Sequence, residues 1–234
     1  MTTVLAFDTA TDVVTVAVGR HGDLIAGRTV ASGRAHAEHL VPTIRAVLDE
    51  ASTALEMVDA VAVGVGPGRF TGLRVGVTTA KALALGLGVP AVGLGTLDVI
   101  AQPWRDDERD VVVVVDARRK EVYWARYHPG PAGLVCTVAP TVAPPAAVVA
   151  ALGSDAVLLV GDGLDRYRVE FAALAGGECM PPHYAAPSPL ALCELADAAV
   201  RSGSVVGPDG LVPVYLRESD AVINWEQARP AVTP

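Results

Sequence analysis

Two stretches of this sequence combine residue types that could hold a phosphate group. Asp8-Thr-Ala-Thr11 follows a short apolar run and would place one carboxylate and two hydroxyls at the tip of a hairpin. Gly66-Pro-Gly-Arg-Phe-Thr-Gly72 precedes a predicted helix, whose N-terminus offers free N–H groups beside glycines that permit close approach. Such groups bind phosphate, and the aspartate could hold magnesium. The residues assigned to this candidate site are Asp8, Thr9, Thr11, Gly66, Gly68, Arg69 and Thr71.

Neither stretch is diagnostic by itself. Asp8-Thr-Ala-Thr11 could equally be an ordinary hairpin turn in which the aspartate bonds its own backbone. The glycine string is not the phosphate-binding loop of nucleoside triphosphatases, because no Lys-Ser or Lys-Thr follows its glycines. It also differs from the dinucleotide-binding motif, because Gly72 comes one residue late.

Small residues recur every fourth position along the helix predicted after the glycine string. Such a ridge lets another element approach closely. It could pack against the protein's own sheet, or against another subunit together with an apolar stripe of the preceding predicted helix. We predict the subunit interface. Its residues would be His36, Leu40, Ile44, Val47, Gly72, Gly76, Ala80 and Ala84.

The sequence predicts no metal site. His36 and His39 are close together, but no third distant ligand is evident. The three cysteines, Cys136, Cys179 and Cys193, are an odd and widely spaced set without metal-ligand spacing. They also make no disulfide framework, which suits a reducing compartment, and we expect a cytoplasmic protein.

Composition excludes several classes of protein. The chain has 234 residues, of which 51% are hydrophobic and 19% charged, so it can bury a core and is not disordered. Lys and Arg number 18 against 26 Asp and Glu, and a net charge of −8 argues against nucleic-acid binding by this chain's own surface. The most apolar stretch, residues 75–94, contains Lys81 and Pro90, so no membrane span is expected.

Hydrophobic periodicity indicates the elements that position the candidate residues. Three short β-branched runs open the chain, and the period becomes helical at residues 40–51. A strand at 61–65 and a helix to about 87 follow, and Thr96 is predicted to cap a brief helix. The same order of three strands, helix, strand and helix occurs again after residue 110. The sequence therefore predicts an α/β fold of two similar halves, residues 1–104 and 105–218, with a cleft between them and a loose tail at 219–234.

Several motifs in this order together resemble one family. They are Asp8-Thr-Ala-Thr11, Arg34-Ala-His-Ala-Glu38, Gly66-Pro-Gly-Arg-Phe-Thr-Gly-Leu-Arg-Val-Gly76, Asp116-Ala-Arg118 with Glu121-Val-Tyr123, and Pro213-Val-Tyr-Leu-Arg217. The set resembles the bacterial TsaB (YeaZ) family over residues 2–218, and the glycine string is among its most specific parts. The resemblance implies a duplicated actin/Hsp70-like (ASKHA, ribonuclease H-like) fold, in which each half has a mixed sheet flanked by helices.

The resemblance also implies a function. TsaB proteins serve the synthesis of threonylcarbamoyladenosine (t6A) at adenosine 37 of tRNAs that read ANN codons, as the non-catalytic scaffold partner of the paralogous transferase TsaD, with the ATPase TsaE. The chain is then expected to contact tRNA only through that complex. Whether it forms a homodimer when alone is left open by the sequence. The paralogue binds its metal through a histidine pair after the glycine-loop helix, whereas here no histidine lies between His39 and His128.

Two enzymatic roles are alternatives to the scaffold role. A small-molecule kinase or ATPase of the same fold would use Asp8 and the Gly66–Gly72 loop. A metalloprotease would need an HExxH motif, which the sequence lacks. In Gly161-Asp-Gly163, the turn that would receive adenosine, the aspartate adds bulk and negative charge. We therefore predict no cofactor, and weak adenine nucleotide binding at most.

Overall fold

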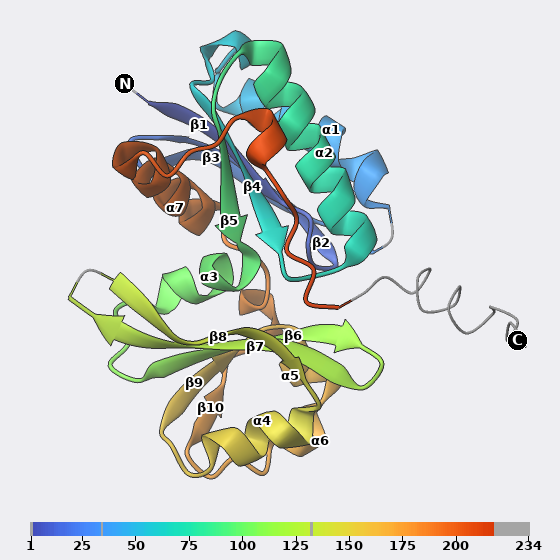
Figure 1. Cartoon of the computed structure of the whole chain (residues 1–234), viewed down its shortest axis with the longest axis vertical. Helices are drawn as coiled ribbons and strands as arrows, with labels where there is room; N and C mark the ends of the chain where they lie inside the picture. The colour runs from blue at the N-terminus through green and yellow to red at the C-terminus, as the bar shows by residue number, and fades with distance from the viewer. Residues whose placement is uncertain (1, 34, 132, 218–234) are drawn as a thin grey trace, which may run out of the picture.

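The computed structural model describes residues 2–33, 35–131 and 133–217, which form two five-stranded sheets placed one beyond the other along the longest axis (Figure 1). The tail predicted at residues 219–234 lies outside the described residues. The elements of the first part of the chain are β1 (Thr3–Asp8), β2 (Val13–Arg20), β3 (Asp23–Ala31), α1 (His36–Glu50), β4 (Ala60–Gly66), α2 (Phe70–Leu87), β5 (Ala91–Gly95) and α3 (Thr96–Ala101). Those of the second part are β6 (Asp110–Arg118), β7 (Glu121–Gly130), β8 (Gly133–Ala143), α4 (Pro145–Leu152), β9 (Val157–Val160), α5 (Gly163–Arg166), α6 (Arg168–Phe171), β10 (Gly177–Cys179) and α7 (Pro189–Ser202).

Both sheets have the same topology. The strand orders are β3-β2-β1-β4-β5 and β8-β7-β6-β9-β10. In each sheet the first three strands form an antiparallel meander, and the fourth and fifth strands are added in parallel. The predicted α/β fold of two similar halves is therefore confirmed. The helix predicted from Asp165 is instead two short helices, α5 and α6, which are separated by Tyr167.

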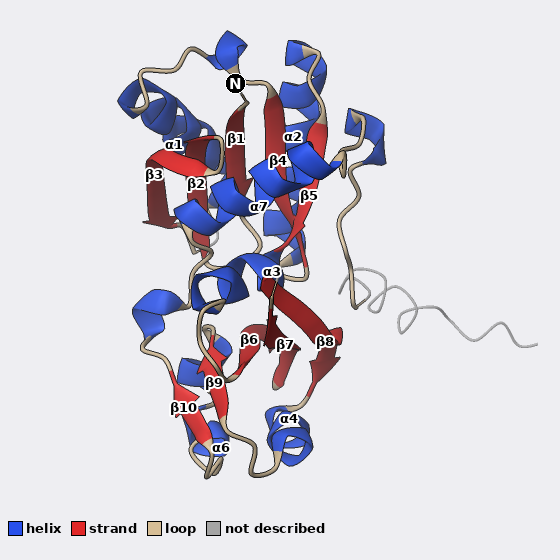
Figure 2. Ribbon diagram, turned by 90° about the vertical axis from the view of Figure 1, so that its left-hand side faces the viewer, coloured by secondary structure: helices blue, strands red, loops and turns tan. Residues whose placement is uncertain are grey.

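Alternating side chains of β1 supply both faces of the first sheet. Leu5 and Phe7 pack in the core beneath α1 and α2, whereas Val4 and Ala6 pack against α7. Figure 2 shows α7 crossing the face of this sheet that α1 and α2 do not cover. The helix α7 comes late in the chain and ties its second part back to the first sheet. The division into residues 1–104 and 105–218 stays a prediction.

Helix α3 and a C-terminal segment join the two halves. Leu97 and Ile100 of α3 pack in one core with β6 and β7 of the second sheet. The hydroxyl of Tyr127 donates to Asp98 of α3 at 2.6 Å. After α7 the chain returns past α2, where the N–H of Val214 donates to the carbonyl of Val65 at 2.7 Å. None of the helices in the described part of the chain has the length and apolar character that crossing a membrane requires.

The residues predicted to form a subunit interface are buried inside the chain. Ala80 and Ala84 of α2 have no exposed surface and pack in the core beneath the first sheet's helices. Leu40, Ile44 and Val47 of α1 belong to that same core, with 0%, 6% and 0% exposure. These side chains are used to hold α1 and α2 on their own sheet, so they present no surface to a second protein.

The glycines of the same ridge lie against the turn between β1 and β2. A Cβ on Gly72 would overlap the carbonyl oxygen of Thr9, and one on Gly76 would overlap the Thr9 hydroxyl. His36 is 3% exposed, and its Nε2 lies 2.7 Å from the carbonyl oxygen of Thr11. The prediction that this ridge and His36 face another subunit is therefore wrong: the small residues let α2 approach its own sheet and turn.

Candidate functional site

Asp8, the last residue of β1, is fully buried and bonded inside the chain. Its Oδ1 accepts the N–H of Ala10 at 2.7 Å, and its Oδ2 accepts the hydroxyl of Thr96 at 2.8 Å. Gly64 makes this possible, because a Cβ there would overlap the carboxylate. Burial raises the pKa of Asp8 despite these two hydrogen bonds. Thr96 thus does not cap α3 as predicted, because Gly95 is the N-cap and the hydroxyl serves Asp8.

The two threonines of the turn Asp8-Thr-Ala-Thr11 also point into the chain. The hydroxyl of Thr9 donates to the carbonyl of Gly72 at 2.7 Å. Thr11 is 4% exposed, and its hydroxyl has no hydrogen-bond partner among the described residues. The structure brings the glycine loop to this turn, because the N–H of Arg69 donates to the carbonyl of Ala10 at 2.8 Å.

The remaining candidate residues occupy the glycine loop and the start of α2. Gly66 has φ +104°, which favours glycine, and Gly68 leaves room for the Ala10 carbonyl that a Cβ would overlap. Arg69 is the N-cap residue of α2, whose first turn receives no side-chain cap. Thr71 lies in that first turn and is exposed.

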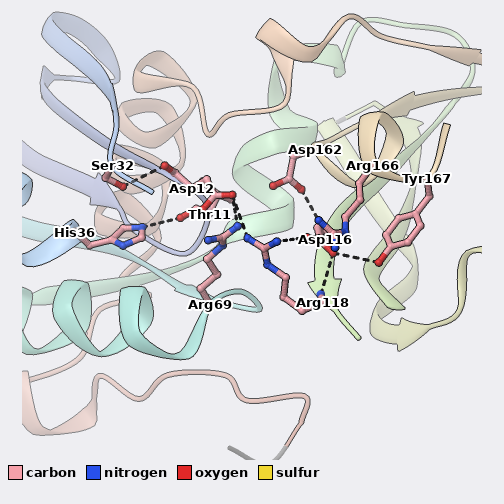
Figure 3. A network of polar contacts seen from close by, with 10 residues as sticks. All are labelled: Thr11, Asp12, Ser32, His36, Arg69, Asp116, Arg118, Asp162, Arg166 and Tyr167. Carbon is pink, nitrogen blue, oxygen red and sulfur yellow. Dashed lines mark hydrogen bonds and ion pairs between the residues drawn. The ribbon is translucent and has the colours of Figure 1, made fainter. Parts of the chain in front are cut away.

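A chain of ion pairs crosses the cleft between the halves (Figure 3). Asp12 of the first half pairs with Arg69 and, at 3.6 Å, with Arg118 of the second half. Arg118 also lies 3.4 Å from Asp116, and Arg166 lies 3.5 Å from the same carboxylate. The sequence pattern predicts no role for Asp12, and it marks Asp116 and Arg118 only as parts of a family motif.

Asp162 lies in the turn after β9, and its carboxylate points toward the C-terminal end of β6. Its Oδ1 accepts the N–H of Asp116 at 2.8 Å. Burial raises the pKa of Asp162 to about 6, and the negative charge of Asp116 adds to the shift. The turn predicted to meet adenosine therefore carries a carboxylate that already uses a backbone N–H group of the cleft.

A cavity of about 670 Å³ opens between the glycine loop, the turn between β6 and β7, and the C-terminal segment. Four arginines line it: Arg69, Arg118, Arg119 and Arg217. Asp116 is the one carboxylate among its described lining residues. Aromatic rings lie on the same wall, and Phe70 contacts Tyr215 with ring centroids 5.1 Å apart.

The cavity joins residues from both halves, and spacing in the sequence gave no sign that they meet. The signals in the sequence are the strings Asp116-Ala-Arg118 and Tyr215-Leu-Arg217, which point to the family but not to a chemical role. No three His, Cys, Asp or Glu side chains within the described ranges are grouped so that they could hold a metal ion. His36 and His39 therefore belong to no such group.

The chain is similar in sequence and structure to proteins of known family. Residues 29–167 match the family model described as "TsaD: tRNA N6-adenosine threonylcarbamoyltransferase". The chain is 40% identical over 223 residues to an uncharacterized protein of Mycobacterium tuberculosis, and the alignment covers 94% of each. It is also 40% identical over 126 residues to the tRNA threonylcarbamoyladenosine biosynthesis protein TsaB of Escherichia coli, which covers 53% of this chain and 54% of that protein.

The structure of YeaZ from Pseudomonas aeruginosa matches with a TM-score of 0.80 and 32% identity, over 92% of this chain and 100% of that one. The chain belongs to the TsaB (YeaZ) family. An activator of 2-hydroxyisocaproyl-CoA dehydratase from Clostridium difficile with bound ADPNP shares the fold alone, with a TM-score of 0.51 and 11% identity. The TsaB-family chain thus has the actin-like (ASKHA) fold that the sequence motifs imply.

Proposed function

We propose that this TsaB-family chain is a non-catalytic subunit for t6A synthesis at adenosine 37 of tRNA, and that it acts by binding the transferase TsaD together with TsaE. The biosynthetic role rests on family membership and on the printed function of the Escherichia coli relative. The non-catalytic role rests on one observation above all. The carboxylate of Asp8, where an enzyme of this fold would hold magnesium, has both oxygens bonded within the chain.

Electrostatics at the same position favour the non-catalytic role. An aspartate binds magnesium as the carboxylate anion. Burial raises the pKa of Asp8, which disfavours the anion, and each of its two oxygens already accepts a hydrogen bond within the chain. A kinase or ATPase would have to ionise this fully buried carboxyl group and expose it to the metal.

We also propose that adenine nucleotide is not a cofactor of this subunit. Asp162 takes the N–H of Asp116 that a phosphate oxygen would otherwise accept. Its charge repels a polyphosphate whenever the carboxyl is ionised. Weak binding is the most that the turn at Gly161-Asp162-Gly163 supports.

We place the contact with the transferase on the exposed sides of α1 and α2. Val41 of α1 is 60% exposed, and Ala82 lies on the exposed side of α2. The two helices lie next to each other on one face of the first sheet (Figure 1). The same surface would serve a homodimer when the transferase is absent.

The test is complex formation between the purified chain and TsaD, measured by calorimetry and size-exclusion chromatography. Val41→Glu and Ala82→Glu should each weaken binding at least tenfold, a loss of about 1.4 kcal/mol. Val169→Glu is the matched control, because Val169 of α6 is 86% exposed and lies in the second half. Equal weakening by all three variants would remove the surface from the proposal. Turnover of magnesium-ATP by the chain alone would overturn the non-catalytic role.

A further inference from the structure

We propose that a surface patch beside α3 binds an arginine-bearing segment of a second protein. We call it the acidic aromatic patch, and its residues are Trp104, Asp106, Glu108, His183 and Tyr184. Arg105 ties this patch to Glu194 of α7, the helix that covers the face of the first sheet opposite to α1 and α2 (Figure 2). The patch is therefore distinct from the proposed contact with the transferase, and both surfaces can be occupied at once.

Two short turns bring the aromatic rings of the patch together. Trp104 ends the 3-10 turn Gln102–Trp104 that follows α3, and Tyr184 ends the 3-10 turn Pro182–Tyr184 that precedes α7. Their ring centroids are 5.1 Å apart in an edge-to-face arrangement, and the His183 ring lies 4.1 Å from that of Tyr184. Tyr184 is 47% exposed, and among the described residues no Arg or Lys is stacked on these rings. The cluster therefore presents an aromatic surface to solvent.

Prolines hold both turns in a fixed conformation. Pro103 lies inside the first turn, and Pro181 and Pro182 begin the second. Because the proline ring fixes φ, the backbone that carries the aromatic rings has little freedom before anything binds. A surface that is already ordered loses little conformational entropy on association, and this favours a binding role for the patch.

The charge around the rings is negative. Residues 105–109 and the adjacent Glu178 and Glu194 contain five carboxylates and two arginines, a net charge of −3. Both arginines are already paired, Arg105 with Glu194 at 2.7 Å and Arg109 with Glu178 at 2.6 Å. The excess of carboxylates is therefore not neutralised by these two arginines.

Two of these carboxylates are open to a cation from outside the chain. The side chain of Asp106 is 92% exposed, and its ion pair with Arg105 is long, at 3.9 Å. Glu108 is exposed and forms no ion pair within the described part of the chain. Both residues follow Trp104 closely in the sequence, so a ligand that contacts the indole ring is also within reach of a carboxylate.

Exposed rings next to free carboxylates define the class of ligand. An arginine side chain stacks its planar guanidinium group on an aromatic face and donates N–H groups to a carboxylate, so a single side chain uses both features of the patch. Lysine has a more strongly hydrated point charge and stacks less well. A nucleic acid or an anionic membrane surface carries the same sign of charge as the patch and is repelled. The partner that fits is therefore a protein segment with arginine side chains.

The experiment is calorimetric titration of the full chain, at low ionic strength, with a pentaarginine peptide whose two ends are capped. Capped pentalysine should bind more weakly, and capped pentaglutamate should not bind. Tyr184→Ser should weaken pentaarginine binding about threefold, because a cation–π contact is lost. Asp106→Asn combined with Glu108→Gln should weaken it about tenfold, because two exposed charges are removed.

Two matched controls separate the patch from general attraction to an acidic protein. Tyr184→Phe keeps the ring and should bind like wild type. Glu56→Gln combined with Asp209→Asn removes the same two charges from exposed positions elsewhere on the chain and should also leave binding unchanged. Asp106 and Glu108 are exposed, so their double variant should keep the melting temperature of wild type and test binding alone.

A titration of the chain already bound to TsaD tests the position of the patch separately from the transferase contact. Pentaarginine should bind this complex as tightly as it binds the chain alone, and weaker binding would contradict the placement on the opposite face. No binding of pentaarginine to the chain, equal weakening by the Glu56 and Asp209 double variant, or competition by a single-stranded oligouridylate would overturn the assignment.

Discussion

Three glycines of α2 offer the same substitution in three different surroundings. Gly72, Gly76 and Gly86 all lie in this helix, and each can be changed to alanine. An added Cβ at Gly86 would have nothing within 4 Å. At Gly76 it would overlap the Thr9 hydroxyl, and at Gly72 it would overlap the Thr9 carbonyl oxygen. The series therefore measures how closely α2 lies against the turn between β1 and β2.

The expected changes in unfolding free energy have different signs. Alanine is better than glycine in a helix by about 0.8–1 kcal/mol, so Gly86→Ala should stabilise the protein by about that amount. At Gly76 the same gain opposes an overpacking cost of about 1–3 kcal/mol, so stability should fall by up to about 2 kcal/mol. At Gly72 the obstacle is backbone, which cannot rotate away. The loss there should be larger, because the hydrogen bond from Thr9 to the Gly72 carbonyl, worth about 1 kcal/mol, is strained as well.

Urea unfolding of the four proteins gives these free energies directly. In thermal melting, each kcal/mol should shift the midpoint by about 2–4 °C for a chain of this size. The order of stability should be Gly86→Ala, wild type, Gly76→Ala and Gly72→Ala. If Gly72→Ala proved as stabilising as Gly86→Ala, α2 could not lie against this turn, and the ridge would again be available to another protein.

Two further predictions concern the core and the cleft. Ala80→Leu should lower the free energy of unfolding by about 1–3 kcal/mol through overpacking, whereas Ala82→Leu on the exposed side should change it little. Urea titration of both variants tests this. Unchanged stability of Ala80→Leu would contradict the burial of that side chain. Asp162 has a pKa of about 6 in the folded state against an ordinary value of 3.8, so its contribution to stability is largest below that ordinary value and is lost as the pH rises through 6. Asp162→Asn should therefore stabilise the protein more at about pH 7.5 than at about pH 4.5, by at most about 3 kcal/mol, and an equal effect at both pH values would contradict the raised pKa.

The repeated order of elements was predictable because each strand and long helix carries its own hydrophobic period. Residues 4–7 read as a strand and residues 61–65 as a strand buried on both faces, and the two lie side by side in the first sheet. The ridge that includes Gly72 and Ala80 was ambiguous for a physical reason. Small residues at every fourth position show that another element packs closely on the helix. They do not show whether that element belongs to the protein's own sheet or to a second protein.

The cleft was the least predictable part. Asp12 and Arg118 are separated by 106 positions in the sequence, and Arg69 meets them only because two hairpin turns face each other in the fold. The role of Thr96 was missed for a similar reason. A threonine at the start of a helix resembles a cap, whereas its partner Asp8 lies on another strand.

The central claim is that this chain serves t6A synthesis as a partner and not as the catalyst. Its most direct test is reconstitution of threonylcarbamoyl transfer to an unmodified tRNA, with TsaD and TsaE present and this chain added or omitted. We predict that t6A forms at a substantial rate only when the chain is added, and that Asp8→Asn, checked for folding, supports the same rate as wild type. Transfer at the full rate without the chain, or transfer catalysed by the chain in the absence of TsaD, would contradict the account.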